Sequence, residues 1–276
     1  MAENAVPKCA VINDLSGFGR CSLTVAIPVL SAMGVQACPV PTAILSNHTG
    51  YEDFHFRDFT NDMETYFSKW KKLGLEFDSI YTGFLGDERQ IELILKFVEE
   101  FCTRDTLLLV DPVMGDHGKR YATCNDRLCD EMRRLVARAH VITPNLTEAC
   151  ILTGQDYPEN PCSERVFEIG EKLLELGSDC AVITGVRKKG KMVNFVLDKS
   201  GEPFAAESDF VACEYCGTGD LFASLMCGYM TLGIPCRVAL ERSADFLIKT
   251  ISASYSLGVD PLDGVAFEKF LREIVI

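Results

Sequence analysis

The chain has 276 residues, which suits one large α/β domain or two small ones, and its 47% hydrophobic and 24% charged residues are ordinary for a globular protein. Its formal net charge of −13 argues against a nucleic-acid backbone or an anionic membrane surface as a partner. The sequence shows neither a signal-peptide pattern nor an apolar run of membrane-spanning length, so we expect a cytoplasmic protein. In a reducing compartment its 13 scattered cysteines are expected to be buried small apolar residues rather than disulfides or zinc ligands.

Short apolar runs alternate with longer helical patterns, which is typical of βαβ units and a largely parallel sheet. The expected strands lie at residues 9–12, 35–40, 79–83, 107–111, 140–143 and 180–184. The helical patterns cover residues 21–33, 58–73, 88–101, the stretch after Asp220, and 237–255. Residues 192–197 and 203–211 flank Asp198-Lys199-Ser200-Gly201 and are expected to form a β-hairpin. We find no linker or repeat in the sequence, which predicts one domain over residues 1–276.

Several of these strands run into turns that contain glycine, proline or a polar side chain. The turns are Asp14–Gly19, Thr82-Gly83-Phe84, Asp111–Asp116, Thr143-Pro144-Asn145 and Thr184-Gly185. In open α/β sheets, ligands bind in the crevice outside the carboxyl ends of the strands. The sequence therefore predicts a ligand site at this edge, although glycine and proline are also common turn residues.

The stretch Cys216-Gly217-Thr218-Gly219-Asp220 leads directly into an apolar, helix-like run. Glycines let the backbone approach a ligand closely, and the free N–H groups at a helix N-terminus favour an anion. Asp220 could then accept a proton from a hydroxyl that attacks a phosphate. The same residues are also compatible with an ordinary loop in which Asp220 caps the helix.

Other oxygen-bearing side chains fall at the same predicted edge, namely Asp111, Asp116, Asn145 and Glu148. Nucleotide-bound Mg²⁺ takes few carboxylates and keeps several waters, so this set can serve a metal–nucleotide site. The alternatives are structural: Asp111 can be a turn carboxylate. Asn145 and Glu148, three residues apart, can form a helix-capping pair.

Together these motifs resemble the pyridoxal kinases of the ribokinase superfamily, over residues Val11 to about Met230. The matching stretches are Ser46-Asn47-His48-Thr49-Gly50-Tyr51, Asp111–Asp116, Ile142–Asn145 with Glu148, and Gly217–Phe222. The resemblance implies a ribokinase-like α/β fold, with a largely parallel sheet flanked by helices and a β-hairpin in the C-terminal half. It also implies ATP-dependent phosphorylation of the 5′-hydroxymethyl group of pyridoxal, pyridoxine or pyridoxamine, with Mg²⁺ and, as a further candidate, a monovalent cation. A homodimer is expected on the same ground.

The resemblance also implies a role for each matching residue. Asp220 is the expected base, and Gly217, Thr218 and Gly219 supply N–H groups to the transferring phosphoryl. On the nucleotide side it places Asp111 and Glu148 near Mg²⁺–ATP, together with Asn145 and Thr184. On the substrate side it places His48 and Thr49 at the pyridine ring, with Phe84 packing against it. Residues 116–121 resemble a lid over ATP, with a plain surface loop as the alternative.

Two positions put the acceptor in question. Asp14 stands where many pyridoxal kinases carry a serine that touches the substrate, and an acid is more typical of hydroxymethylpyrimidine kinases. Cys216 is expected to face the substrate, either as an apolar wall or as a thiol that adds reversibly to the aldehyde, with a pKa lowered by the helix N-terminus. The alternatives to a vitamin B6 kinase are therefore a hydroxymethylpyrimidine kinase and a binder of vitamin B6 or nucleotide that does not catalyse.

Overall fold

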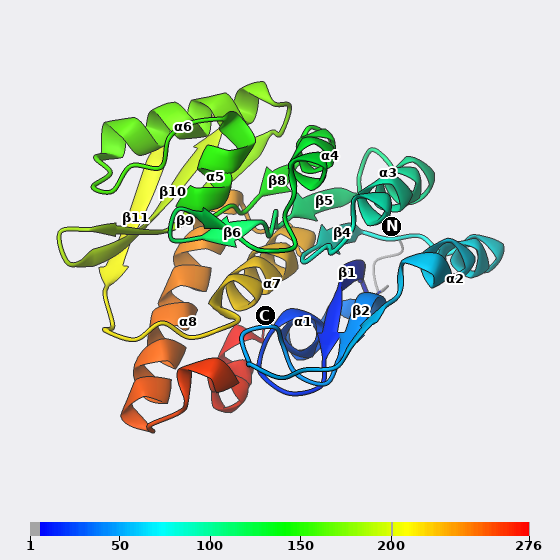
Figure 1. Ribbon diagram of the computed structural model, residues 1–276, viewed down its shortest axis with the longest axis horizontal. Helices are drawn as coiled ribbons and strands as arrows, with labels where there is room; N and C mark the ends of the chain where they lie inside the picture. Colours follow the sequence, from blue (N-terminus) through cyan, green and yellow to red (C-terminus); the bar gives the residue numbers. More distant parts are fainter. Residues whose placement is uncertain (1–5, 200, 276) are drawn as a thin grey trace.

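A computed structural model describes residues 6–199 and 201–275, and within them nine strands form one mixed sheet in the order β11-β10-β9-β8-β5-β4-β1-β2-β3 (Figure 1). Six strands pair in parallel: β1 (Lys8–Ser16), β2 (Gln36–Leu45), β4 (Ser79–Thr82), β5 (Leu107–Val110), β8 (Val141–Ile142) and β9 (Cys180–Lys188). Three more add antiparallel edges: β3 (Phe56–Asp58), β10 (Lys191–Asp198) and β11 (Phe204–Asp209). A separate hairpin joins β6 (Gly115–Asp116) to β7 (Lys119–Arg120). The α/β fold with a largely parallel sheet is confirmed.

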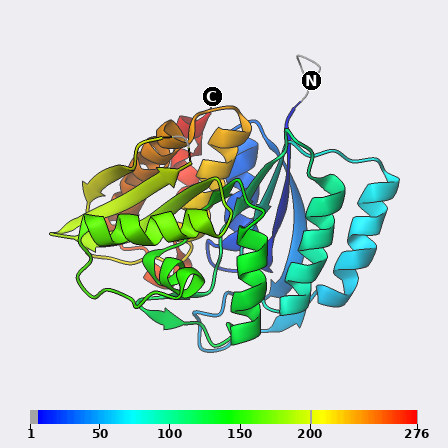
Figure 2. The same ribbon diagram turned by 90° about the horizontal axis from the view of Figure 1, so that it is seen from above.

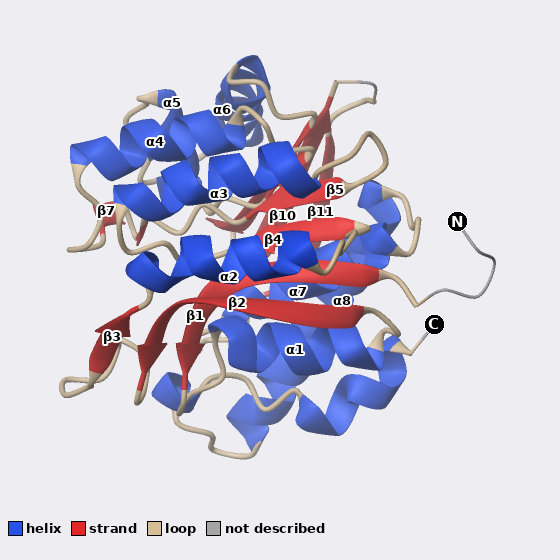
Figure 3. Ribbon diagram, turned by 90° about the vertical axis from the view of Figure 1, so that its right-hand side faces the viewer, coloured by secondary structure: helices blue, strands red, loops and turns tan. Residues whose placement is uncertain are grey.

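Helices cover both faces of the sheet (Figures 2 and 3). One layer contains α2 (Thr60–Lys72), α3 (Glu88–Phe101), α4 (Asp126–Val136), α5 (Leu146–Thr153) and α6 (Ser163–Glu175). The other contains α1 (Ser22–Ala32), α7 (Thr218–Thr231) and α8 (Cys236–Ser256), followed by the short 3₁₀ helices η1 (Pro261–Asp263) and η2 (Glu268–Ile274). Among the described residues, we find no helix with both the length and the apolar character needed to cross a membrane.

The central strands are apolar on both sides because each side faces a helical layer. In β5, Leu108 and Val110 pack into the core under α2–α6, whereas Leu109 packs into the core under α1, α7 and α8. Helix α3 begins and ends where the apolar spacing predicts, and the side chain of its N-cap Asp87 accepts a hydrogen bond from Arg89 N at 2.8 Å. The continuous apolar run thus explains strand β5, and the capped amphipathic run explains helix α3.

Some boundaries differ from the sequence prediction. Strand β2 continues to Leu45 because Ala43–Leu45 pair with β3, and α2 begins only after β3 has ended. Strand β9 extends to Lys188 because it pairs with β10. The predicted hairpin is formed by β10 and β11, and Ser200 in its expected turn lies outside the described residues. Helices α4 and α6 were not predicted.

Candidate active site

The two glycines before Asp220 have different physical roles. Gly217 is the N-cap of α7 with φ +72°, and a Cβ there would lie 1.9 Å from Arg20 O, so the turn requires glycine. A Cβ on Gly219 would meet no atom within 4 Å. Gly219 therefore has open space on its Cβ side in the first turn of α7, where the first N–H groups have no partner within the helix. This is the geometry of an anion site at a helix N-terminus.

Asp220 lies in the first turn of α7, yet it does not cap the helix. Its Oδ1 instead accepts a hydrogen bond from Asn13 Nδ2 at 3.1 Å, across the sheet edge on β1. Burial, together with the nearby charge of Asp14, raises the pKa of Asp220 to about 6. Hydrogen bonds from the N–H of Ser22 and the amide of Asn13 lower the pKa and offset part of this rise. The carboxyl is thus ionised at neutral pH and directed away from its own helix, as a proton acceptor would be.

Asp111, directly after β5, and Glu148, in the first turn of α5, form a pair of buried carboxyls, 7% and 4% exposed. Burial and the charge of Asp220 raise the pKa of Asp111 to about 8, and burial and the charge of Asp111 raise that of Glu148 well above its usual range. Asp111 accepts a hydrogen bond from Thr143 Oγ1 at 3.2 Å. A divalent cation would relieve this mutual repulsion, so the residues present fit Mg²⁺.

Glu148 also caps helix α5. Its Oε2 accepts from Asn145 N at 2.8 Å and its Oε1 from Met114 N at 3.1 Å, while Asn145 Oδ1 accepts from Glu148 N at 2.9 Å. Asn145 Nδ2 donates to Gly115 O at 2.8 Å. Asn145 and Glu148 therefore do form the helix-capping pair. Any contact of Glu148 with a nucleotide would be made in addition to this capping role. In the described residues, no three His, Cys, Asp or Glu side chains are grouped so that they could hold a metal ion.

Thr184 lies beside Asn145 through an isolated parallel bridge, in which Thr184 N donates to Pro144 O at 2.9 Å. The next residue, Gly185, has φ +69°, and a Cβ there would meet no atom within 4 Å. The segment after β8 and the middle of β9 thus lie side by side next to Glu148, with open space at Gly185. The structure brings the predicted nucleotide residues together at one edge.

The predicted lid is the β6–β7 hairpin. At its tip, His117 Nε2 lies 3.2 Å from Glu214 Oε2, and Gly118 N donates to Thr147 Oγ1 at 2.8 Å. Glu214 belongs to the loop that precedes Cys216. The hairpin is therefore attached both to α5 and to the loop leading into the anion site.

On the predicted substrate side, Asp14 is 6% exposed and both of its oxygens are engaged. Oδ1 accepts from Ser22 Oγ at 2.5 Å and Oδ2 from Ser16 Oγ at 2.9 Å. Burial nevertheless raises the pKa of Asp14. The carboxyl is held in place by two hydroxyls next to Asp220, beside a register shift between β1 and β2 at Asn13 and Leu15.

His48 and Tyr51 fasten their loop to η1, more than two hundred residues later. The Nε2 of His48 lies 2.7 Å from Leu262 O, its Nδ1 accepts from Gly50 N at 3.1 Å, and Tyr51 O–H donates to Asp263 Oδ1 at 2.8 Å. These partners fix the neutral tautomer with the proton on Nε2. Thr49 is exposed between them. His48 thus holds the loop in position, and Thr49 is free to contact a ligand.

Cys216 is tied to the same 3₁₀ helix, since its N–H donates to Pro261 O at 3.0 Å. Burial and the charges of Asp220 and Asp260 raise the pKa of its thiol, so the expected lowering by the helix N-terminus is wrong. The expectation that no two cysteines stand at C-x₂-C spacing is wrong, since Cys213 and Cys216 do. Among the described residues every cysteine is a free thiol.

Phe84 follows β4 and is half-buried, with its N–H donated to Asn13 Oδ1 at 2.8 Å and its carbonyl accepting from Thr42 Oγ1 at 3.0 Å. The contact with Asn13 was not predicted. A polar side chain in an otherwise apolar strand (Cys9 to Ile12 precede it) was the available signal. Asn13 thereby connects the Phe84 turn to Asp220.

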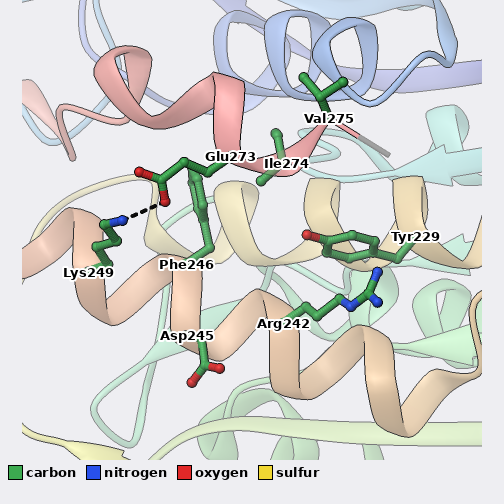
Figure 4. A pocket seen from close by; sticks show the side chains of 8 residues that line it. All are labelled: Tyr229, Arg242, Asp245, Phe246, Lys249, Glu273, Ile274 and Val275. Carbon is green, nitrogen blue, oxygen red and sulfur yellow. Dashed lines mark hydrogen bonds and ion pairs between the residues drawn. The ribbon is translucent and has the colours of Figure 1, made fainter.

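A hollow of about 510 Å³ on the surface lies elsewhere (Figure 4). It lies between α7, α8 and the C-terminal segment, and a Lys249–Glu273 ion pair of 2.5 Å crosses it. It is lined by Tyr229, Arg242, Asp245, Phe246, Lys249, Glu273, Ile274 and Val275. Tyr229 is nine residues beyond Asp220, about 14 Å along the helix, so this hollow is separate from the anion site.

A sheet of this order, with a helix N-terminus facing buried carboxyls at its carboxyl edge, is that of the ribokinase-like kinases of small molecules. The family model for phosphomethylpyrimidine kinase matches residues 25–263, and the chain belongs to this family. Pyridoxal kinase from Lactobacillus plantarum has a similar structure, with a TM-score of 0.91 and 31% identity over 98% of this chain and 97% of that one.

Two further relatives bear on the substrate. A Bacteroides thetaiotaomicron structure, named provisionally as a phosphomethylpyrimidine kinase and solved with pyridoxal, has a TM-score of 0.94 and 39% identity over 98% of this chain and 96% of that one. The pyridoxine/pyridoxal/pyridoxamine kinase of Bordetella avium is 26% identical over 86% of this chain and 82% of its own length. The predicted relationship to pyridoxal kinases is confirmed.

Proposed function

We propose that the protein transfers the γ-phosphoryl group of ATP to the 5′-hydroxymethyl group of pyridoxal, pyridoxine and pyridoxamine. The observation that carries this is the placement of Asp220 beside the open N-terminus of α7, opposite the buried pair of Asp111 and Glu148. The relatives named as pyridoxal kinases, and the relative solved with pyridoxal, support the choice of acceptor.

In this proposal the oxygen of the 5′-hydroxyl attacks the γ-phosphorus of ATP, and Asp220 accepts the proton of that hydroxyl. The bond between the γ-phosphorus and the β–γ bridging oxygen breaks, and ADP leaves. With a pKa of about 6, Asp220 is ionised at pH 7 to 8 and can take that proton. The N–H groups of Gly217, Thr218 and Gly219 face the transferring group, and the open space at Gly219 lets it approach. Phosphoryl transfer depends mainly on positioning and charge stabilisation, which these groups provide.

Asp111 and Glu148 would hold Mg²⁺ on the nucleotide side. Bound there with ATP, the metal would neutralise phosphate charge. With a pKa of about 8, Asp111 is largely protonated at neutral pH when no cation is bound, and burial also raises the pKa of Glu148. Asn145 positions Glu148 through the capping pair, and Thr184 lines the nucleotide side next to it.

On the acceptor side, we assign Phe84 to packing against the pyridine ring and Thr49 to contact with the same ring. His48 holds the loop that carries Thr49, Cys216 forms a wall, and Asp14 supplies a fixed carboxyl near Asp220. The raised pKa of the Cys216 thiol favours its role as a wall over that of a nucleophile.

Hydroxymethylpyrimidine is the second candidate acceptor, because the matched family model is that of phosphomethylpyrimidine kinase and because Asp14 replaces the serine of many pyridoxal kinases. A panel assay with ATP, Mg²⁺, the three B6 vitamers and hydroxymethylpyrimidine separates the two. We expect phosphorylated B6 vitamers as the main products. A turnover confined to hydroxymethylpyrimidine would replace the proposal, and no turnover of any acceptor would leave a binder.

Further expectations belong to the same proposal: one domain over residues 1–276, a cytoplasmic location, a homodimer, and a monovalent cation as a second cofactor. Sedimentation of the purified protein tests the dimer. Activity with K⁺ replaced by a bulky organic cation tests the monovalent ion.

A further inference from the structure

Asn13 is completely buried near the end of β1, and all of its polar atoms are used. Its Oδ1 accepts from Phe84 N at 2.8 Å and from Asp14 N at 2.9 Å, and its Nδ2 donates to Asp220 Oδ1 at 3.1 Å. Because Oδ1 already faces two N–H donors, the amide cannot be flipped, and a donor must face Asp220.

The neighbouring strand makes room for this amide. A Cβ on Gly83, at the end of β4, would lie 2.2 Å from Asn13 Nδ2 and 2.5 Å from its Cγ. Gly83 N in turn donates to Ile12 O at 2.9 Å, which fixes the two strand ends side by side. The amide therefore occupies the volume that any other residue at position 83 would fill.

From these contacts we infer that Asn13 is a positioning residue, which fixes the carboxylate of Asp220 and joins it to the backbone of Phe84, so that base and acceptor pocket form one rigid unit. This inference rests on the proposed role of Asp220 as base. Asn13 itself touches neither the acceptor nor the nucleotide in this assignment. Its effect is on the alignment of Asp220 with the attacking hydroxyl, where a misplacement of about 1 Å can cost about 100-fold in rate.

The test is a cycle of four proteins: wild type, Asn13→Ala, Gly83→Ala and the double variant. We expect kcat to fall at least about tenfold in each single variant, with the KM for ATP within about twofold of wild type. In the Asn13→Ala background, Gly83→Ala should change kcat by less than about twofold, because the atoms that its methyl group displaces are gone. An equal loss in both backgrounds, or a kcat for Asn13→Ala near that of wild type, would overturn the inference.

A second variant covers the case in which Asn13→Ala folds poorly. Asn13→Asp keeps the oxygen that accepts from Phe84 and Asp14 and replaces the donor toward Asp220 by a second carboxyl oxygen, which adds a like charge beside that carboxylate. It should therefore lower kcat while the KM for ATP stays near that of wild type. Asn194→Asp is the matched control for stability: this amide is also buried, at 6% exposed, and accepts from Gly185 N at 2.9 Å. The unfolding free energy of Asn194→Asp, compared with that of wild type, gives the general cost of replacing a buried amide by a carboxyl group.

Asp220→Asn separates this inference from the proposed function. If Asp220→Asn keeps its kcat, the base assignment fails, whatever Asn13 does. If Asp220→Asn is inactive while Asn13→Ala and Asn13→Asp turn over normally, only the inference about Asn13 fails.

Discussion

Replacement of Asp220 by asparagine should lower kcat and raise the free energy of unfolding, and the gain in stability should depend on pH. An acid whose pKa is raised from 3.8 to about 6 by folding holds its proton more tightly in the folded chain. The stability that this tighter binding contributes is complete below pH 4 and is lost as the pH rises through 6. A rise of that size corresponds to about 3 kcal/mol.

The effect of the charge on the unfolding free energy can be separated from the effect of the hydrogen bonds that the substitution disturbs. Asparagine offers one acceptor where aspartate offers two, and the contact with Asn13 Nδ2 can suffer for this reason. That loss is similar at every pH, whereas the charge contribution grows between about pH 4 and pH 6 and is complete above pH 6. The unfolding free energy of Asp220→Asn relative to wild type should therefore rise by up to about 3 kcal/mol between pH 4 and pH 8.

The assay is urea unfolding of both proteins at pH 4 and pH 8, in EDTA and without nucleotide, alongside kcat at pH 8 with saturating ATP and Mg²⁺. We expect kcat to fall by about 100-fold to 10,000-fold, the usual contribution of a general base. A relative stability that does not change with pH would refute the burial argument. A kcat within a few-fold of wild type would refute the assignment of Asp220 as base.

Further substitutions test the other parts of the site. Gly217→Ala should lower the unfolding free energy by about 3 kcal/mol or more, because its methyl would strike Arg20 O at a positive φ. Gly219→Ala should keep wild-type stability and lose about tenfold or more in kcat, and the reverse pattern would contradict the roles given to the two glycines. Glu148→Gln should raise the Mg²⁺ concentration for half-maximal rate about tenfold, and an unchanged requirement would remove Glu148 from the metal. His48→Ala should lower the unfolding free energy by about 1–2 kcal/mol and raise the KM for pyridoxal, and a selective loss of kcat would make it catalytic instead.

Local patterns predicted much of the fold because they carry their own physical cause. The apolar run of β5 requires burial on both sides, and the spacing from Asp87 to Phe101 gives both the cap and the stripe of α3. Helices α4 and α6 had comparable stripes, at Leu128, Met132 and Leu135 in the first case, and could have been found in the same way. Strand β3 is three exposed residues and becomes a strand only by pairing with β2.

The site was predictable where a motif is contiguous and not where a contact crosses the chain. The pair Asn145 and Glu148 could be interpreted as a cap or as a nucleotide site, and the structure shows that the cap is formed. The partner of His48 lies 214 residues away, and that of Asn13 lies 207 residues away, so no spacing in the sequence points to either. The expected lowering of the pKa of the Cys216 thiol was wrong because burial and the charges of Asp220 and Asp260 raise that pKa.

The short 3₁₀ helix η1 has a consequence for how the protein can be divided. Every sequence motif of the site ends by Phe222, so a fragment that stops after α8 would retain all of them. Such a fragment would lack the acceptors of His48, Tyr51 and Cys216, which are Leu262 O, Asp263 Oδ1 and Pro261 O. The loop at residues 48–51, which belongs to the proposed acceptor site, is thus held by a segment more than two hundred residues later, and shortened versions of this protein must keep the chain through Gly264 in order to retain these contacts.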